Sequence, residues 1–115
     1  MNTQQVYEKI RAHFTHPGAE LATETGRGCV YRGDYDAHSP VRCAVGVLIP
    51  DEVYEPEMEV DTARDGGVRK VLEQQGVDIK FAGKCQLAHD NSTSVEHFIE
   101  RLDDLAREEL LDVVR

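Results

Sequence analysis

The chain has 115 residues, of which 40% are apolar and 30% charged, so it is long enough for one globular domain and is not typical of a disordered protein. Thirteen basic and 22 acidic residues give a net charge of −9, which disfavours direct binding to nucleic acid or to anionic membranes and favours a basic protein partner. The longest uncharged apolar run, residues 43–49, is far shorter than the roughly 20 residues that a membrane span needs. Residues 1–5 do not resemble a secretory signal, so we expect a cytoplasmic protein without a membrane partner.

The first predicted element is an amphipathic helix near the N-terminus. Asn2 or Thr3 can cap it, and residues 16–18, His-Pro-Gly, should end it. Its apolar residues fall at helical spacing, namely Val6, Tyr7, Ile10 and Phe14. Residues 19–28 are small and polar and predict a surface loop.

A β-hairpin is predicted next. Residues 29–32 are β-formers by type, residues 33–40 are rich in turn formers, and residues 41–45 can return as the second strand. The apolar run 43–49 fits a buried strand or a buried helical turn equally well. Residues 50–52, Pro-Asp-Glu, predict the first turn of a short helix.

Three helices are predicted in the second half of the chain. Gly66 and Gly67 precede the first, residues 68–75, which Gly76 should terminate, and residues 82–90 form the second. Residues 93–96, Thr-Ser-Val-Glu, have the form of a capping box in front of the third. The apolar residues of this closing helix step by three and four: Val95, Phe98, Ile99, Leu102, Leu105, Ala106, Leu110 and Val113.

These elements predict one compact domain, residues 1–115, of the α+β class. It is mainly helical, with a small β-hairpin and a long C-terminal amphipathic helix. The closing helix should bury Phe98, Ile99, Leu102 and Leu105 against the apolar run 45–49.

The cysteines and one histidine raise the question of a metal site. Cys85 and His89 lie four residues apart and share one face of a helix, and Cys29, His38 or Cys43 can complete a tetrahedral zinc site. The set contains no CxxC or HxxxH pair, and three cysteines do not make a disulfide framework. A buried, reduced thiol is the alternative for Cys29 and Cys43. We predict no cofactor, with zinc as the alternative.

Thiol catalysis is a second candidate chemistry. Cys43 can serve as the nucleophile, His89 as the base and Asp90 as the residue that orients it. The apolar run after Cys43 favours an inert core thiol instead, since catalysis needs an exposed thiolate. His89 and Asp90 can equally satisfy backbone groups at a helix end.

The remaining candidates are binding residues. Arg32 can pair with Glu52 or Glu55 inside the domain, or it can anchor an interface. The acidic segment 51–61 lacks the spacing and the glycine of a calcium loop, which leaves a solvated loop or a surface for a basic partner. The candidate binding residues are Tyr31, Arg32, Asp51, Glu52, Tyr54, Glu57, Glu59, His89 and Asp90.

Several linked motifs resemble a family of small proteins of tailed bacteriophages and bacterial genomes. The motifs are Cys-Val-Tyr-Arg at 29–32, Arg-Cys-Ala-Val-Gly-Val-Leu-Ile at 42–49, Asp-Glu-Val-Tyr at 51–54, Pro-Glu-Met-Glu at 56–59 and Gln-Leu-Ala-His-Asp at 86–90. The closing helix is also part of the resemblance, which covers most of the chain. Cys85 is outside the pattern, and Glu59-Val60 departs from the Glu-Gly that usually follows Met. The family has no assigned activity, so the resemblance implies a phage or prophage context and no mechanism.

Two hypotheses follow. The first is a non-enzymatic accessory protein in the cytoplasm of a bacterial host, which binds a host protein with a basic surface, for example as an inhibitor or a counter-defence protein. The alternative is a small metal-binding enzyme, or one that depends on Cys43, His89 and Asp90. An exposed Val-Tyr or Tyr-Arg patch would also allow a homodimer.

Overall fold

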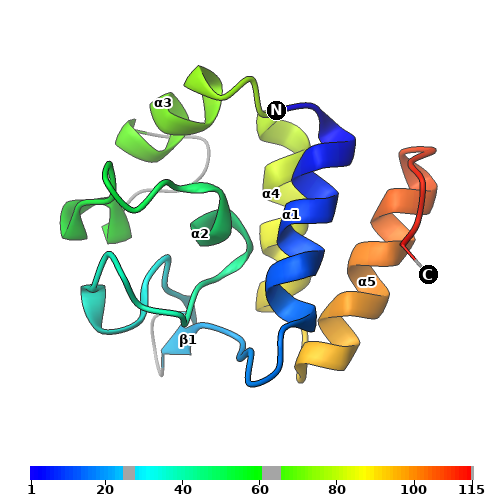
Figure 1. Cartoon of the computed structure of the whole chain (residues 1–115), viewed down its shortest axis with the longest axis horizontal. Helices are drawn as coiled ribbons and strands as arrows, with labels where there is room; N and C mark the ends of the chain where they lie inside the picture. The colour runs from blue at the N-terminus through cyan, green and yellow to red at the C-terminus, as the bar shows by residue number, and fades with distance from the viewer. Residues whose placement is uncertain (25–27, 61–65, 115) are drawn as a thin grey trace.

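A computed structural model describes residues 1–24, 28–60 and 66–114 of the chain. In chain order its elements are α1 (Thr3–Thr15), β1 (Thr23–Glu24), β2 (Gly28–Cys29), the 3-10 turn η1 (Gly33–Tyr35), α2 (Ala44–Leu48), the 3-10 turn η2 (Pro56–Val60), α3 (Gly66–Gln74), α4 (Ile79–Asp90) and α5 (Val95–Glu108). Helices α2 and α5 each contact both α1 and α4, with α2 on one side of these two helices and α5 on the other (Figure 1).

The N-terminal helix is confirmed. Asn2 caps α1 by accepting the backbone N–H of Gln5, and the Gln5 side chain accepts the N–H of Asn2 in return. The four residues predicted at its apolar face are all buried: Val6, Tyr7, Ile10 and Phe14. Gly18, at φ +83°, lies in the turn that leaves the helix, a conformation that favours glycine.

The α+β prediction is wrong, because the hairpin between residues 29–32 and 41–45 does not form. Two backbone hydrogen bonds join these segments, from Gly33 to Val41 (2.8 Å) and from Cys43 to Val30 (3.2 Å). The chain then turns into α2. In the part of the chain that the structure describes, strand pairing is limited to the two-residue contact of β1 with β2, so the fold is all-helical.

The run 44–48 forms the short helix α2, which has too few turns to satisfy all of its own backbone groups. Its residues are all buried. Cys43 is the N-cap, and its Sγ accepts the N–H of Gly46 (3.4 Å). A Cβ at Gly46 would collide with the carbonyl oxygen of Tyr31, so glycine is what allows α2 to lie against that backbone. The helix predicted to begin at residues 50–52 does not form there. These residues form a turn, and the next helical geometry is the 3-10 turn that begins at Pro56.

The three helices predicted in the second half of the chain are confirmed, but they begin or end at other residues than predicted. Gly76 follows α3 at φ +73°, as expected of a glycine that terminates a helix. Helix α4 begins earlier than predicted because Asp78 caps it, accepting the N–H of Phe81 (3.0 Å). The cap of α5 is Ser94, which accepts the N–H of His97 (3.0 Å).

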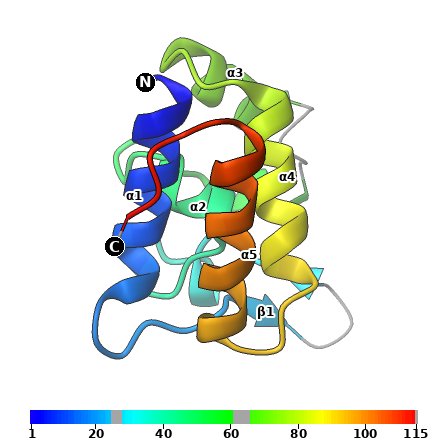
Figure 2. The same ribbon diagram turned by 90° about the vertical axis from the view of Figure 1, so that its right-hand side faces the viewer.

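The closing helix is shorter than predicted and packs on different partners. Phe98, Leu102 and Ala106 are fully buried, whereas Ile99 and Leu105 are only partly buried. They pack on α1 and α4 and not on the run 45–49, which lies on the far side of those helices (Figure 2). Leu110 lies beyond the helix end at φ +58° and is 92% exposed.

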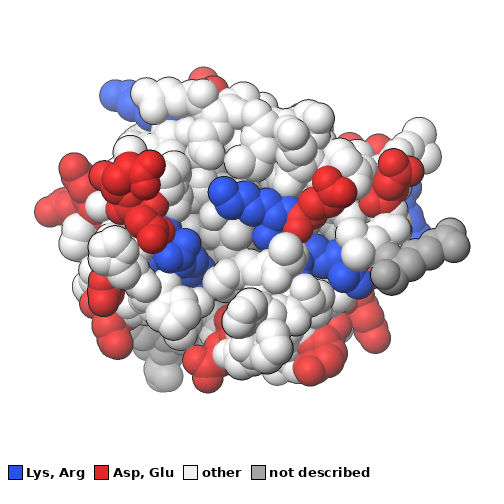
Figure 3. Space-filling view, in the orientation of Figure 1, with Lys and Arg blue, Asp and Glu red and all other residues white. Residues whose placement is uncertain are grey.

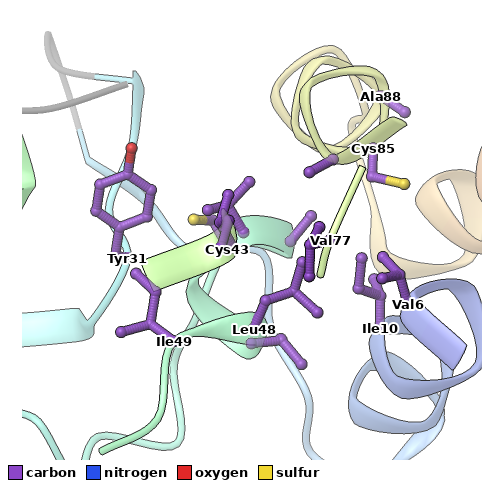
Figure 4. Packing of buried hydrophobic residues seen from close by; sticks show 14 of the residues in the cluster. Val6, Ile10, Tyr31, Cys43, Leu48, Ile49, Val77, Cys85 and Ala88 are labelled. Carbon is purple, nitrogen blue, oxygen red and sulfur yellow. The ribbon is translucent and has the colours of Figure 1, made fainter. Parts of the chain in front are cut away.

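A single apolar cluster joins all these layers. Leu48 and Ile49 reach it from the side of α2, and Val6 and Ile10 reach it from α1 (Figure 4). Because the cluster contains residues from both ends of the chain, the described residues form one folding unit.

Candidate functional site

Arg32 is the centre of a buried polar network beside α2, and its side chain is fully buried. It donates to the carbonyl oxygens of Ala37 (from Nε, 3.1 Å), Tyr31 (from Nη1, 3.2 Å), Gly46 (from Nη1) and Ile49 (from Nη2, 2.5 Å), and to Oδ1 of Asp51 (from Nη2, 3.1 Å). A guanidinium has five N–H donors, so each has an acceptor. Arg32 therefore holds the C-terminal end of α2 and pairs with Asp51, not with the predicted Glu52 or Glu55.

Glu59 fixes the segment that carries η2 onto this network. Its Oε1 accepts the backbone N–H of Tyr31 (2.9 Å), and its Oε2 accepts the N–H of Arg32 (3.1 Å) and the hydroxyl of Tyr54 (2.6 Å). Burial, followed by the Glu59 hydrogen bond, raises the pKa of Tyr54, which therefore stays a neutral donor. The Tyr54 ring also lies 5.3 Å from the guanidinium carbon of Arg32.

Asp51 connects the buried network to the surface. It accepts from Arg32 and from Arg42 (3.0 Å), and its Oδ2 lies 3.5 Å from Nδ1 of His38. Desolvation alone would raise its pKa, but the charge of Arg42 and the Arg32 hydrogen bond outweigh this and lower it. Asp51 is thus an ionised bridge between two arginines.

Most of the other side chains of this segment are exposed, whereas Met58 is partly buried against the core. We define the acidic face as the exposed residues Glu52, Val53, Glu55, Glu57 and Val60. It combines three carboxylates with two valines that are 40% and 83% exposed, Val53 and Val60. Glu52 and Glu57 were predicted from the acidic run, which also contains Glu55, whereas the exposure of the valines has no signal in the sequence.

His89 and Asp90 belong to a different part of the molecule. His89 is fully buried, its Nε2 accepts the N–H of Ala22 (3.2 Å), and its Nδ1 lies 3.1 Å from Oδ1 of Asp90. The proton is therefore on Nδ1. His89 also packs between the rings of Phe14 and Phe98, with centroids 5.7 and 5.5 Å away. Its contacts are those of a core residue that ties the segment before β1 to α4.

Asp90 extends this link to α2. Its Oδ1 also accepts from Nε2 of Gln86 (2.8 Å), and Oε1 of Gln86 accepts the N–H of Val45 (2.9 Å). Gln86 thus satisfies an N-terminal backbone N–H of α2, one of the groups that a helix leaves without an internal partner.

The described thiols are buried and lie apart. Cys43 and Cys85 are both 0% exposed, and Figure 4 shows their sulfur atoms pointing in opposite directions. Burial raises the pKa of Cys85 to about 12, so its thiol stays protonated at neutral pH. The side chain of Cys29 lies outside what the structure describes. Among the described residues, no three His, Cys, Asp or Glu side chains are grouped to hold a metal.

Comparisons with protein-family models, curated proteins and solved structures found no match.

Within residues 1–24, 28–60 and 66–114, no helix has both the length and the apolar character to span a bilayer.

Proposed function

We propose that the chain is a non-catalytic binding module that docks its acidic face onto a basic surface of a host protein. In this proposal the protein is phage- or prophage-associated and acts in the bacterial cytoplasm, as the motif resemblance suggests. One observation about residues 51–60 carries the proposal. Asp51, Tyr54 and Glu59 form hydrogen bonds within the buried network around Arg32, whereas the residues of the acidic face are exposed and can contact a partner.

The inward ties support binding because they order the acidic face in advance. Glu59 and Tyr54 anchor η2 to the backbone of Tyr31 and Arg32, which the core holds in turn. A surface that is already ordered loses little conformational entropy when a partner binds.

Charge and apolar exposure support a basic partner that also has apolar surface. Figure 3 shows acidic side chains gathered over the left-hand edge of the molecule, where Figure 1 places the green segment with η2. The net charge of −9 steers a basic partner toward such a surface. The two valines offer apolar contact once the partner has docked.

A second copy of the chain fits this face poorly, because like charges would meet across the interface. The Tyr-Arg patch that would allow a homodimer is also not exposed, since Tyr31 and Arg32 are 5% and 0% exposed.

A charge-neutral variant of the acidic face tests the proposal. The triple variant Glu52→Gln, Glu55→Gln, Glu57→Gln removes three surface charges and no hydrogen bond described above. The matched control, Glu8→Gln, Glu20→Gln, Glu100→Gln, removes the same charge from exposed positions elsewhere.

Both variants and the unaltered protein are immobilised and exposed to lysate of a bacterium that carries the gene. We expect a protein that the unaltered chain and the control retain, that the acidic-face variant loses, and that is released between roughly 50 and 500 mM salt. Equal retention by both variants would rule out the acidic face as the docking surface.

A further inference from the structure

A cavity of about 570 Å³ lies where the end of α1 faces the segment 38–42. Its polar lining consists of His13, His16, His38 and Arg42, and the rest is Ala12, Pro17, Gly18, Ala19 and Pro40. Three of the five histidines of the protein therefore surround one opening. The spacing of His13 and His16 is visible in the sequence, but the approach of His38 and Arg42 depends on the fold.

One of these histidines has an unsatisfied ring nitrogen. Nε2 of His13 is the one buried side-chain nitrogen or oxygen without a hydrogen-bond partner among the residues that the structure describes. Such a group costs free energy in the folded protein unless something else satisfies it. Because this atom has almost no accessible surface, a ligand in the cavity reaches it only if the His13 ring turns toward the cavity.

The one permanently charged side chain that lines the cavity, Arg42, is positive and favours an anion. None of the described residues that line it is acidic. Burial lowers the pKa of His13 most, and the nearby charges of Arg42, His16 and Arg32 lower it further. Positive groups that repel a proton from His13 also repel a metal cation and attract an anion.

Three carbonyl groups near the end of α1 already have hydrogen-bond donors. The carbonyl oxygens of Arg11 and Ala12 accept from the hydroxyl of Thr15, at 3.0 and 3.3 Å, and that of His13 accepts the N–H of His16.

Two of the polar groups are held in place before any ligand binds. Nδ1 of His16 lies 3.0 Å from the carbonyl oxygen of Pro17, so Nδ1 carries the proton that this bond needs. Arg42 donates from Nε to the carbonyl oxygen of Ser39 (2.8 Å) and pairs through Nη2 with Asp51 (3.0 Å). Asp51 offsets part of the charge of Arg42 and fixes its direction.

We propose that this cavity binds the phosphate group of a small molecule. A phosphate presents three or more acceptor oxygens to the remaining N–H groups of the Arg42 guanidinium and to Nε2 of His16 and His38, which donate when these rings are protonated, whereas a carboxylate presents two. The volume exceeds that of a single phosphate ion and lies within the range of small-molecule sites, so a phosphate ester fits better than free phosphate. This proposal is independent of the acidic face.

The five histidines allow an NMR test on the intact protein. Ring signals are followed while inorganic phosphate or adenosine monophosphate is added at constant ionic strength and pH. We expect His13, His16 and His38 to shift together and to saturate, and His89 and His97, which do not line the cavity, to stay unchanged. The ester should saturate at a lower concentration than phosphate.

Arg42→Gln should weaken binding about tenfold or more, because it removes a charged donor. Arg101→Gln is the matched control, since Arg101 lies on α5 beside a different cavity. Arg42 also supports Asp51, so the exposed His16→Gln provides a second variant that should weaken binding while urea unfolding stays unchanged.

Three results would overturn the proposal: equal shifts of all five histidines, no saturation by either probe below roughly 10 mM, or unaltered binding by both cavity variants. Stoichiometric zinc binding that shifts the same three histidines, with no response to either phosphate probe, would identify a metal site instead.

Discussion

The two sides of this molecule owe their order to different interactions. On one side α1, α4 and α5 pack through apolar faces, with Phe98 and Leu102 fully buried between them. On the other side the long segments around α2 contain little regular structure, and Arg32 and Glu59 hold them by hydrogen bonds to backbone groups. Both candidate binding surfaces border the second side, because hydrogen-bonded segments without helix can bring together side chains that a helix face would keep apart.

The sharpest way to break this comparison is to remove the arginine. Arg32→Met should cost about 3–5 kcal/mol in the free energy of unfolding, because it leaves buried carbonyl groups without a donor and removes one of the two arginine partners of Asp51. Arg32→Lys should not restore the stability, since an ammonium cannot reproduce five donors in a plane. Urea unfolding measures both. Arg101→Met on the exposed face of α5 should change stability by less than about 0.5 kcal/mol, and an equal cost at both positions would contradict the role given to Arg32.

The helical side depends on Leu102. Leu102→Ala should cost about 2–5 kcal/mol through lost burial and a residual cavity, because Leu102 is fully enclosed. Glu100→Ala on the outward face should change the free energy of unfolding by less than about 0.5 kcal/mol. Equal urea midpoints for the two variants would mean that the buried stripe of α5 is misassigned.

Two glycines give effects of opposite sign. Gly46→Ala should destabilise the protein by about 1–3 kcal/mol, because the added Cβ meets the backbone of Tyr31 and forces α2 away. Gly83→Ala should stabilise it by about 0.5–1 kcal/mol, since Gly83 lies inside α4 with open space at its Cβ. Thermal unfolding should place the two midpoints on either side of the unaltered protein, and a matching sign would contradict the close approach at Gly46.

The last expected effect concerns Asp103, which joins α5 to α1, and it depends on pH. It accepts from Nε of Arg11 (2.9 Å) and from the hydroxyl of Tyr7 (2.6 Å). Burial alone would raise its pKa, but these two hydrogen bonds outweigh burial and lower it. Because the pKa of Asp103 is lower in the folded protein, its ionised carboxylate stabilises the fold at pH values above the unfolded-state pKa. This stabilisation is lost as the pH falls through the folded-state pKa. Asp103→Asn should therefore cost about 1–2 kcal/mol at pH 7 and progressively less below about pH 4. Urea unfolding at several pH values checks this, and a cost that does not change with pH would mean that the ionised carboxylate is not the stabilising form.

The sequence predicts the helical side well and the other side poorly, for a physical reason. The periodic spacing of Val6, Ile10 and Phe14 marks a buried face before any partner is known, and their burial confirms it. The run 43–49 has no such period. The position of its helix depends on Gly46, which has no side chain and lets the backbone of Tyr31 come close, and on Arg32, which donates hydrogen bonds to carbonyl groups.

The candidate functional site is also only partly predictable from the sequence. The acidic run indicates exposed carboxylates at Glu52 and Glu57, but it cannot say that Glu59 turns inward to backbone N–H groups 27 and 28 residues away. Every residue carries such groups, so they leave no signal in the sequence. The same reasoning explains why Arg32 is readily mistaken for an interface residue.

The contact between the two ends of the described chain has a consequence for the order of folding. Beyond Leu110 the chain runs back along α1, where the amide of Gln4 binds the backbone of Asp112 and the hydroxyl of Tyr7 accepts the N–H of Val114 (Figure 2). These partners are 107 and 108 residues apart, separations that slow folding relative to helical proteins of similar size with local contacts. During synthesis α1 therefore emerges well before α5, and the part of its apolar face that packs on α5 stays available to chaperones until nearly the whole described chain has left the ribosome.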